Sequence, residues 1–154
     1  MDFTFEVLQN TRRIFQGIIE NNSLEDLNKI PNGFNNNIIW NIGHIVVTQQ
    51  LLVYKLSGLD MGVSSEMIDK YRKDTKPELP VSQQEVVEIK GLLIPTLEKT
   101  KDDYAQGVFK TYHEYTVSTT GNTLSDINDA LQFVLAHECI HYGYVLALLK
   151  VIKN

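Results

Sequence analysis

The chain has 154 residues, of which 43% are hydrophobic and 21% charged, so it is suited to one folded domain and is not a disordered tail. Its net charge of −5 and the lack of a Lys/Arg block argue against a protein that binds the nucleic-acid backbone through several phosphates. The apolar runs are too short for a membrane span, and the N-terminus lacks the apolar region of a signal peptide. The single cysteine, Cys139, excludes an intrachain disulfide framework, which fits the reducing cytoplasm. Taken together, these features lead us to expect a single domain, residues 1–154, that contacts neither nucleic acid nor membrane.

Hydrophobic periodicity predicts four long helices, at about residues 4–21, 36–57, 82–106 and 123–152. Shorter helical turns are expected at residues 23–26 and 65–70, and an extended or loop segment at 111–121. Capping boxes begin at Ser23, Ser82 and Thr123, and Gly58 is expected to end the second long helix in the left-handed conformation. Pro95 should kink the third long helix, and Arg12 lies unexpectedly on the apolar stripe of the first.

This pattern of elements predicts an all-α fold. Four long helices without a convincing sheet are typical of a four-helix bundle, here with a long connector, residues 59–80, between the second and third helices. Bundles form metal and ligand sites from side chains that point inward from different helices. The direction of each polar side chain on these helices therefore decides whether the chain has such a site.

The last helix carries the sequence HECIH, residues 137–141, which fits the metalloprotease pattern H-E-x-x-H. At roughly 100° per residue, His141 falls about 40° from His137, and both lie on the apolar stripe that faces the core. Glu138 lies at the edge of that stripe, and Cys139 lies on the far side, so the thiol is not expected to be a ligand. The helix therefore directs two imidazoles inward.

A third ligand is needed, because a catalytic zinc usually takes three protein ligands. The other histidines are His44, on the second long helix, and His113, in the 111–121 segment. His44 shares a polar stripe with Asn41 and Thr48, which favours it as the third ligand. The alternative is that these histidines are hydrogen-bonded core residues without a metal, although burying two imidazoles without partners would cost free energy.

A metalloprotease is disfavoured, because the 13 residues after His141 contain no His, Asp or Glu that could serve as the usual downstream ligand. The sequence instead resembles the DinB-like (DinB/YfiT-like) superfamily of metalloenzymes. The resemblance rests on Trp40-Asn41-Ile42-Gly43-His44 in the second long helix and on His137-Glu138-Cys139-Ile140-His141 in the fourth, and it extends over nearly the whole chain.

The resemblance implies a four-helix bundle in which His44, His137 and His141 hold a divalent metal, zinc or nickel. Characterised relatives include transferases that use low-molecular-weight thiols such as bacillithiol or mycothiol, and many members are homodimers. It thus implies a small-molecule substrate, a possible thiol co-substrate and a homodimer. An alternative is a non-catalytic metal- or ligand-binding, stress-related bundle protein, and a third is an interaction module with a metal-free core.

Three neutral imidazoles leave open positions on a metal, where either water or a thiol could be activated. The expected reaction is therefore hydrolysis or thiol transfer, and the ligand set does not choose between them. Glu138 is the candidate general base or a group that orients a ligand, or else a solvated residue at the bundle edge. Asn41 and Thr48 are candidates to orient ligands or substrate, or to bond between helices. Trp40 is a core residue or a substrate platform, and the Arg12 head group is expected to reach water.

Overall fold

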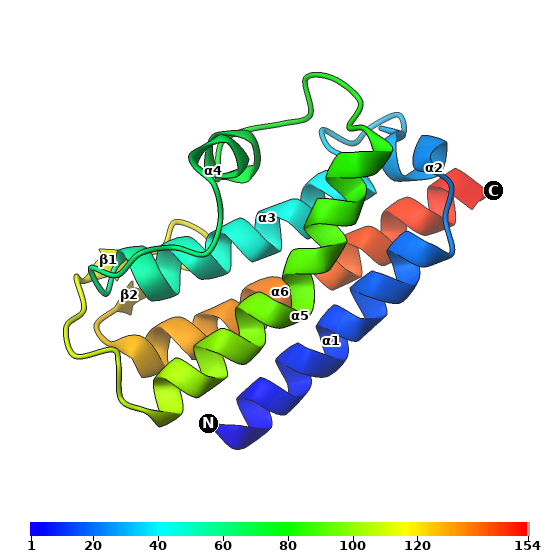
Figure 1. Ribbon diagram of the computed structural model, residues 1–154. Helices are drawn as coiled ribbons and strands as arrows, with labels where there is room; N and C mark the ends of the chain where they lie inside the picture. The colour runs from blue at the N-terminus through cyan, green and yellow to red at the C-terminus, as the bar shows by residue number, and fades with distance from the viewer. Residues whose placement is uncertain (154) are drawn as a thin grey trace.

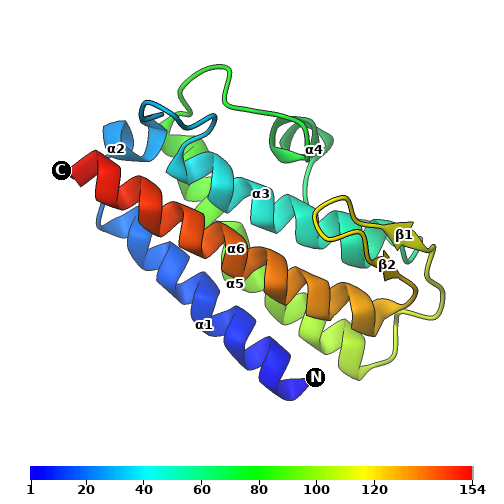
Figure 2. The same ribbon diagram turned by 180° about the vertical axis from the view of Figure 1, so that it is seen from behind.

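The computed structural model describes residues 1–153, and its architecture is an all-α bundle of long helices (Figures 1 and 2). The long helices are α1 (Asp2–Glu20), α3 (Ile38–Gln50), α5 (Gln83–Ala105) and α6 (Ile127–Lys153). Packing follows a closed ring in which α1 contacts α5, α5 contacts α3, α3 contacts α6 and α6 contacts α1. Helices α1 and α6 run in one direction and α3 and α5 in the other (Figure 1). The predicted fold class is therefore confirmed.

The short elements lie outside this ring. They are α2 (Leu24–Asn28), α4 (Ser65–Tyr71) and the strands β1 (Tyr115–Thr116) and β2 (Thr123–Leu124). The two strands form an antiparallel pair in which Tyr115 faces Leu124 and Thr116 faces Thr123. Figure 2 places this pair at the end of the bundle where α6 begins, and α4 beside α3 within the long connector. The small sheet is a feature that the sequence patterns did not predict.

Most helix starts are fixed by a side-chain oxygen that accepts a backbone N–H three residues on, as expected of N-caps. Ser23 and Ser82 cap α2 and α5 as predicted. Asn37 caps α3, which begins at Ile38, two residues after the start expected at residue 36. The expected start of the last helix at Thr123 is wrong, because Thr123 pairs in β2; Asp126 is the cap, accepting the N–H groups of residues 128 and 129.

The second long helix is not α-helical throughout. After Gln50 it continues as a π-helix, η1 (Leu51–Lys55), in which Leu56 donates its N–H to the Leu51 carbonyl over 3.3 Å. Gly58 then turns the chain with a φ of 70°, as the sequence predicts. Single π-turns insert an extra residue into a helical face and are frequent at functional sites.

The core consists of two apolar clusters separated by a polar layer. One cluster includes Phe15, Ile42 and Val145, and the other includes Leu8, Val53 and Leu131. All four long helices contribute buried polar side chains to the bundle interior, including Arg12, His44, Gln49, Gln50, Thr96, Thr100, His137 and Glu138. Buried polar groups require partners. The middle of the bundle is therefore where a site should be sought.

By length and hydropathy alone, α6 is the one helix among residues 1–153 that could cross a membrane. Its inner face, however, packs on α1 and α3 and carries His137 and the fully buried Glu138. Such a face is typical of a core helix in a bundle. Ile140, Leu146 and Val151 of α6 are each about half exposed.

Candidate metal centre

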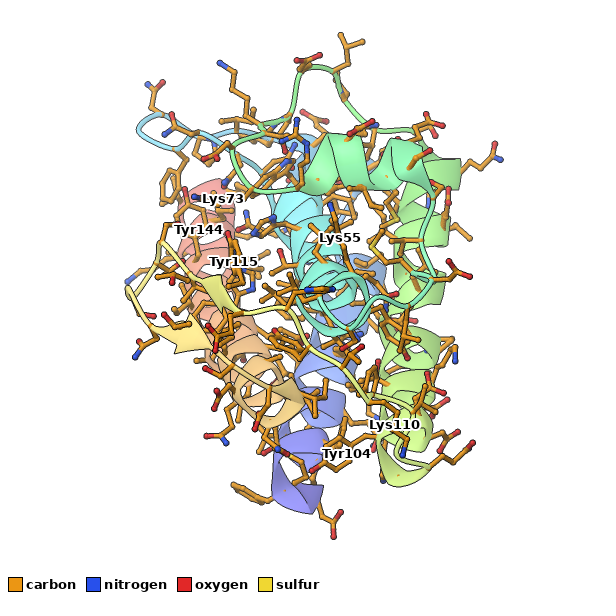
Figure 3. The ribbon with its side chains drawn as sticks, turned by 90° about the vertical axis from the view of Figure 1, so that its left-hand side faces the viewer. Lys55, Lys73, Tyr104, Lys110, Tyr115 and Tyr144 are labelled. Carbon is orange, nitrogen blue, oxygen red and sulfur yellow. The ribbon has the colours of Figure 1, made fainter. Side chains whose placement is uncertain are left out.

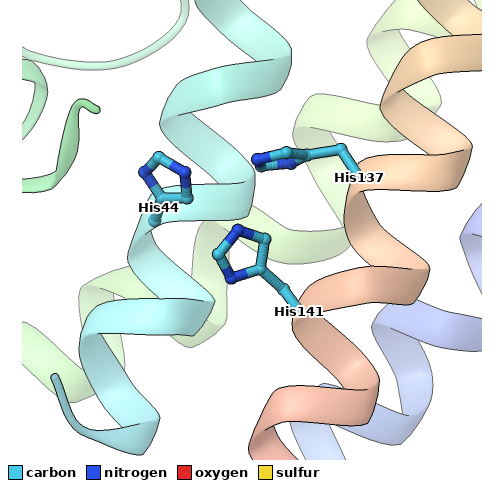
Figure 4. Close-up of side chains that lie close together, drawn as sticks. All are labelled: His44, His137 and His141. Atoms are coloured by element: carbon cyan, nitrogen blue, oxygen red, sulfur yellow. The ribbon is translucent and has the colours of Figure 1, made fainter. Parts of the chain in front are cut away.

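Three histidines from two helices converge in the polar layer (Figure 4). One ring nitrogen of each of His44, His137 and His141 lies within 4.8 Å of those of the others. The ring centroids are 5.1 Å apart for His44 and His137, and 4.8 Å for His44 and His141. His137 and His141 are separated by 4.5 Å, as expected of residues one helical turn apart. The predicted convergence of His44 with the HECIH histidines is thus what the structure has.

The orientation of His44 is set by a backbone group. Its Nδ1 lies 2.6 Å from the carbonyl oxygen of Tyr71, the last residue of α4. A carbonyl oxygen can only accept, so Nδ1 carries the proton and Nε2 keeps its lone pair. The Thr48 hydroxyl lies 3.3 Å from that Nε2. Helix α4, from the middle of the connector, therefore fixes the ring of a residue on α3.

Close packing explains why α4 can reach His44. The residue before His44 is Gly43, and a Cβ built there would lie 2.6 Å from Cδ1 of the Tyr71 ring. Any side chain larger than hydrogen would therefore collide with that ring. The glycine in Trp40-Asn41-Ile42-Gly43-His44 allows α4 to approach α3 closely enough for the Tyr71 carbonyl to accept from His44.

His141 is oriented by a side-chain amide. Its Nδ1 lies 2.8 Å from Oδ1 of Asn41. The Asn41 amide nitrogen donates to the Asn37 carbonyl over 2.7 Å and to Asn36 Oδ1 over 3.0 Å, which requires Oδ1 to face the histidine. Nδ1 of His141 is therefore the protonated nitrogen, and its Nε2 is free to coordinate. Asn41 fills the orienting role that the sequence allowed for it.

Trp40 packs against the ring of His44. Its ring stacks on that of His44 with centroids 4.7 Å apart and planes 10° apart, and its Nε1 donates to Thr75 Oγ1 over 3.3 Å. The side chain of Trp40 is buried, and it does not line the cavity that adjoins the three histidines. Trp40 is thus a core residue that holds the imidazole plane, and the structure gives it no exposed face for a substrate.

Burial keeps these imidazoles neutral. Desolvation lowers the pKa of His137 to about 2 and that of His141 to about 4, and repulsion from the neighbouring imidazoles adds to both shifts. The pKa of His44 is also lowered by burial, although its bond to the Tyr71 carbonyl opposes the shift. Neutral imidazole is the form that coordinates metals. The donor set, its spacing and its protonation therefore fit a divalent ion.

Glu138 is not among the residues that line the cavity beside the three histidines. Its carboxylate pairs with Arg12, with Nη2 2.7 Å from Oε1, and both side chains are fully buried. Arg12 also donates to the Leu93 carbonyl over 2.8 Å and to Thr96 Oγ1 over 2.9 Å. Two expectations are therefore wrong: the Arg12 head does not reach water, and Glu138 is not solvated. The signal was present in the sequence, since a charge on an apolar stripe requires a buried partner.

A cavity of about 390 Å³ adjoins the three histidines between α3, α6 and the hairpin. Besides these histidines it is lined by Thr48, Leu51, Leu52, Lys55, Leu56, Lys73, Tyr115, Val117, Ser118, Thr119, Phe133 and Ile140. His113 is exposed in the segment before β1, and Cys139 is exposed on the outer face of α6. Neither belongs to the cluster. Sequence reasoning missed most of the cavity wall, because it comes from the π-helix and the hairpin.

An all-α bundle with three inward histidines beside a cavity is compatible with a metal site. The model of the DinB superfamily matches residues 8–145, so the chain belongs to this superfamily. No curated protein matches the chain.

Proposed function

We propose that the protein is a divalent-metal-dependent enzyme whose ion is held by His44, His137 and His141. The observation that carries the proposal is the convergence of their nitrogens within 4.8 Å, with two rings oriented by bonds to Tyr71 and Asn41. Imidazole ligands suit zinc and nickel, the two ions we expect. The bound ion would supply Lewis acidity, lowering the pKa of a water or thiol in the adjoining cavity.

The protein's own residues define the rest of the site. The Tyr71 carbonyl and the Asn41 amide hold the protons of two imidazoles on Nδ1, so that each Nε2 is the nitrogen left to coordinate a metal. Thr48 adds a hydroxyl beside His44, where it can bond to a ligand. The wall of the cavity is largely apolar, and polar interactions are stronger in apolar surroundings than in water.

Between the two expected reactions, we favour thiol transfer over hydrolysis. Hydrolysis of a stable bond benefits from a general base that takes a proton from water, and no carboxylate is among the described residues that line the cavity. A thiol has an ordinary pKa near 8.5 and can lose its proton to solvent on binding. Its sulfur then attacks an electrophilic carbon as the leaving group departs with the bonding pair.

Elemental analysis of protein purified without a metal-chelating tag tests the metal site. We expect about one zinc or nickel ion per chain, and loss of that ion in His44→Ala. His113→Ala is the matched control, because that histidine is exposed and outside the cluster. Absence of metal in the native protein, with no binding on titration, would overturn the proposal.

Turnover assays distinguish the reactions. An alkyl halide is offered with a low-molecular-weight thiol such as bacillithiol or mycothiol, and an ester is offered with water alone. We expect thiol consumption that depends on the metal. Metal binding without turnover of either substrate would favour the alternative, a non-catalytic metal- or ligand-binding bundle. We further propose a small-molecule substrate and a cytoplasmic location, in keeping with the single exposed thiol.

A further inference from the structure

The cavity beside the histidines has a charge opposite to that of the whole chain. The protein carries a net charge of −5, yet the described lining includes two lysines, Lys55 and Lys73, and neither Asp nor Glu. A cavity lined by one sign of charge with apolar walls concentrates ligands of the other sign. The local charge therefore favours an anion.

The two lysines reach the cavity from different elements. Lys73 follows α4 by two residues and lies close in sequence to Tyr71, whose carbonyl bonds to His44. Among the described residues, its one ion pair is a long contact of 3.8 Å with the adjacent Asp74, between exposed side chains, and such a contact is weak. Lys55 ends the π-helix and has no ion-pair partner among residues 1–153. Figure 3 looks onto this side of the molecule and labels both lysines together with Tyr115.

The distance along α3 and η1 indicates how long a ligand the cavity can hold. Lys55 follows His44 by eleven residues, which is on the order of 15 Å along a helix axis. The wall between them is apolar, with Leu51, Leu52 and Leu56 on one side and Phe133 and Ile140 on the other. The π-helix contributes to this wall, since Leu51 and Leu52 both line the cavity. An extended apolar body therefore fits better than a compact polar one.

We propose that this cavity binds an elongated amphipathic anion, whose apolar body lies on the leucine wall and whose carboxylate-like group is held by Lys55 and Lys73. The inference rests on the proposed function, because it names the class of substrate for that same site. An exposed lysine contributes modestly to binding, so the two together are expected to matter more than either alone.

Calorimetric titration with octanoate tests the proposal, with octanol as an uncharged ligand of equal chain length. We expect octanoate to bind roughly fivefold to tenfold more weakly to the double variant Lys55→Gln/Lys73→Gln than to the unaltered protein. Octanol should bind both proteins equally. Added salt should weaken octanoate binding to the unaltered protein more than to the double variant. Lys110→Gln is the control, since this exposed lysine does not line the cavity.

Each titration is made with zinc-loaded protein and again after chelation. Loss of octanoate affinity in the double variant under both conditions supports the proposal. Equal affinity of the double variant and the unaltered protein would overturn it, as would affinity that depends on zinc and not on the lysines, because the carboxylate would then bind the metal. If the protein holds no metal but octanoate binding still needs the lysines, the proposed function fails and this inference stands.

Discussion

At the scale of single residues, the candidate site depends on hydrogen bonds that fix each imidazole. Asn41 shows how this works, because its amide donates to two groups on one side and accepts from His141 on the other. A ligand ring that is free to rotate must be ordered when the metal binds, which lowers affinity. The residues that orient the histidines should therefore affect metal binding nearly as much as the histidines.

Replacing Asn41 by Leu is expected to weaken zinc affinity by about 10- to 100-fold, because Nδ1 of His141 loses its acceptor. Competition titration with a chromophoric chelator measures the effect. Asn41→Asp is the matched control, since a carboxylate still accepts from Nδ1 and should preserve binding. Full affinity in Asn41→Leu would remove Asn41 from the site.

The histidines also predict a pH dependence for the metal-free protein. Their folded-state pKa values lie below the ordinary value of 6.5, at about 4 for His141 and about 2 for His137. Below pH 6.5 the unfolded chain binds more protons than the folded chain, so the free energy of unfolding falls as the pH falls. We expect the denaturant midpoint to decrease from pH 7 towards pH 4. The decrease should be smaller in His137→Leu, and an equal decrease in both proteins would contradict this account.

At the scale of elements, the polar layer links helices that are distant in the sequence. The pair of Arg12 and Glu138 joins α1 to α6, and the bonds of Arg12 to Leu93 and Thr96 add α5. Pro95 lies in this part of α5, where it removes a backbone donor. Glu138 is adjacent to His137, so the ion pair also fixes the turn of α6 that carries two of the three candidate ligands.

Breaking this ion pair should destabilise the fold. Arg12→Met leaves the Glu138 carboxylate buried and unpaired, and we expect a loss of about 3–5 kcal/mol in the free energy of unfolding. The double variant Arg12→Met/Glu138→Leu removes both charges and should be much closer to the unaltered protein. Chemical denaturation of all three proteins measures this. Additive losses in the double variant would mean that the two side chains do not act as a pair.

The contact between α3 and α4 yields a second test at this scale. Gly43→Ala places a methyl group against the Tyr71 ring and should move α4 away, so we expect weaker zinc binding and lower stability. Gly91→Ala is the control, because nothing lies near a Cβ at that helical position and alanine there should stabilise by about 0.5–1 kcal/mol. Zinc titration and thermal unfolding give both results. Unchanged zinc affinity in Gly43→Ala would show that α4 does not hold His44.

The sequence predicted the elements better than their details, for physical reasons. Periodicity identified the long helices and placed His44, His137 and His141 inside the bundle, because these depend on residues near in sequence. The π-helix and the β-hairpin depend on tertiary packing, which local patterns do not encode. The partner of Glu138 lies 126 residues away, so its burial could not be derived from α6 alone. Likewise, nothing near His44 in sequence indicates the carbonyl of Tyr71.

At the scale of the whole molecule, the outer face of α6 is a candidate interface for the homodimer that the family resemblance implies. Leu146 lies on this face and is about half exposed, whereas Ile140 and Val151 are about half exposed nearer the edge of the helix that faces the histidine cavity. An exposed apolar side chain on the outer face of a helix is suited to an interface between two copies of a chain. We therefore propose that a second copy covers this part of α6.

Light scattering coupled to size-exclusion chromatography tests the dimer. We expect the unaltered protein to elute as a dimer and Leu146→Glu to shift it towards monomer, because a charge would be buried at the interface. Val87→Glu on α5 is the control, since Val87 is similarly exposed but belongs to another helix. A monomeric unaltered protein, or a dimer insensitive to Leu146→Glu, would contradict the proposal.

The bond between His44 and Tyr71 has a consequence for protein engineering. The atom that accepts from the imidazole belongs to the main chain, so any amino acid at position 71 would present the same oxygen. Exchange of the side chain at position 71 would therefore leave this bond in place, whereas a shift of the main chain at that position would break it. Grafting a connector of different length, with its helix seated at the same point, would thus redesign one wall of the protein and leave the imidazole geometry intact.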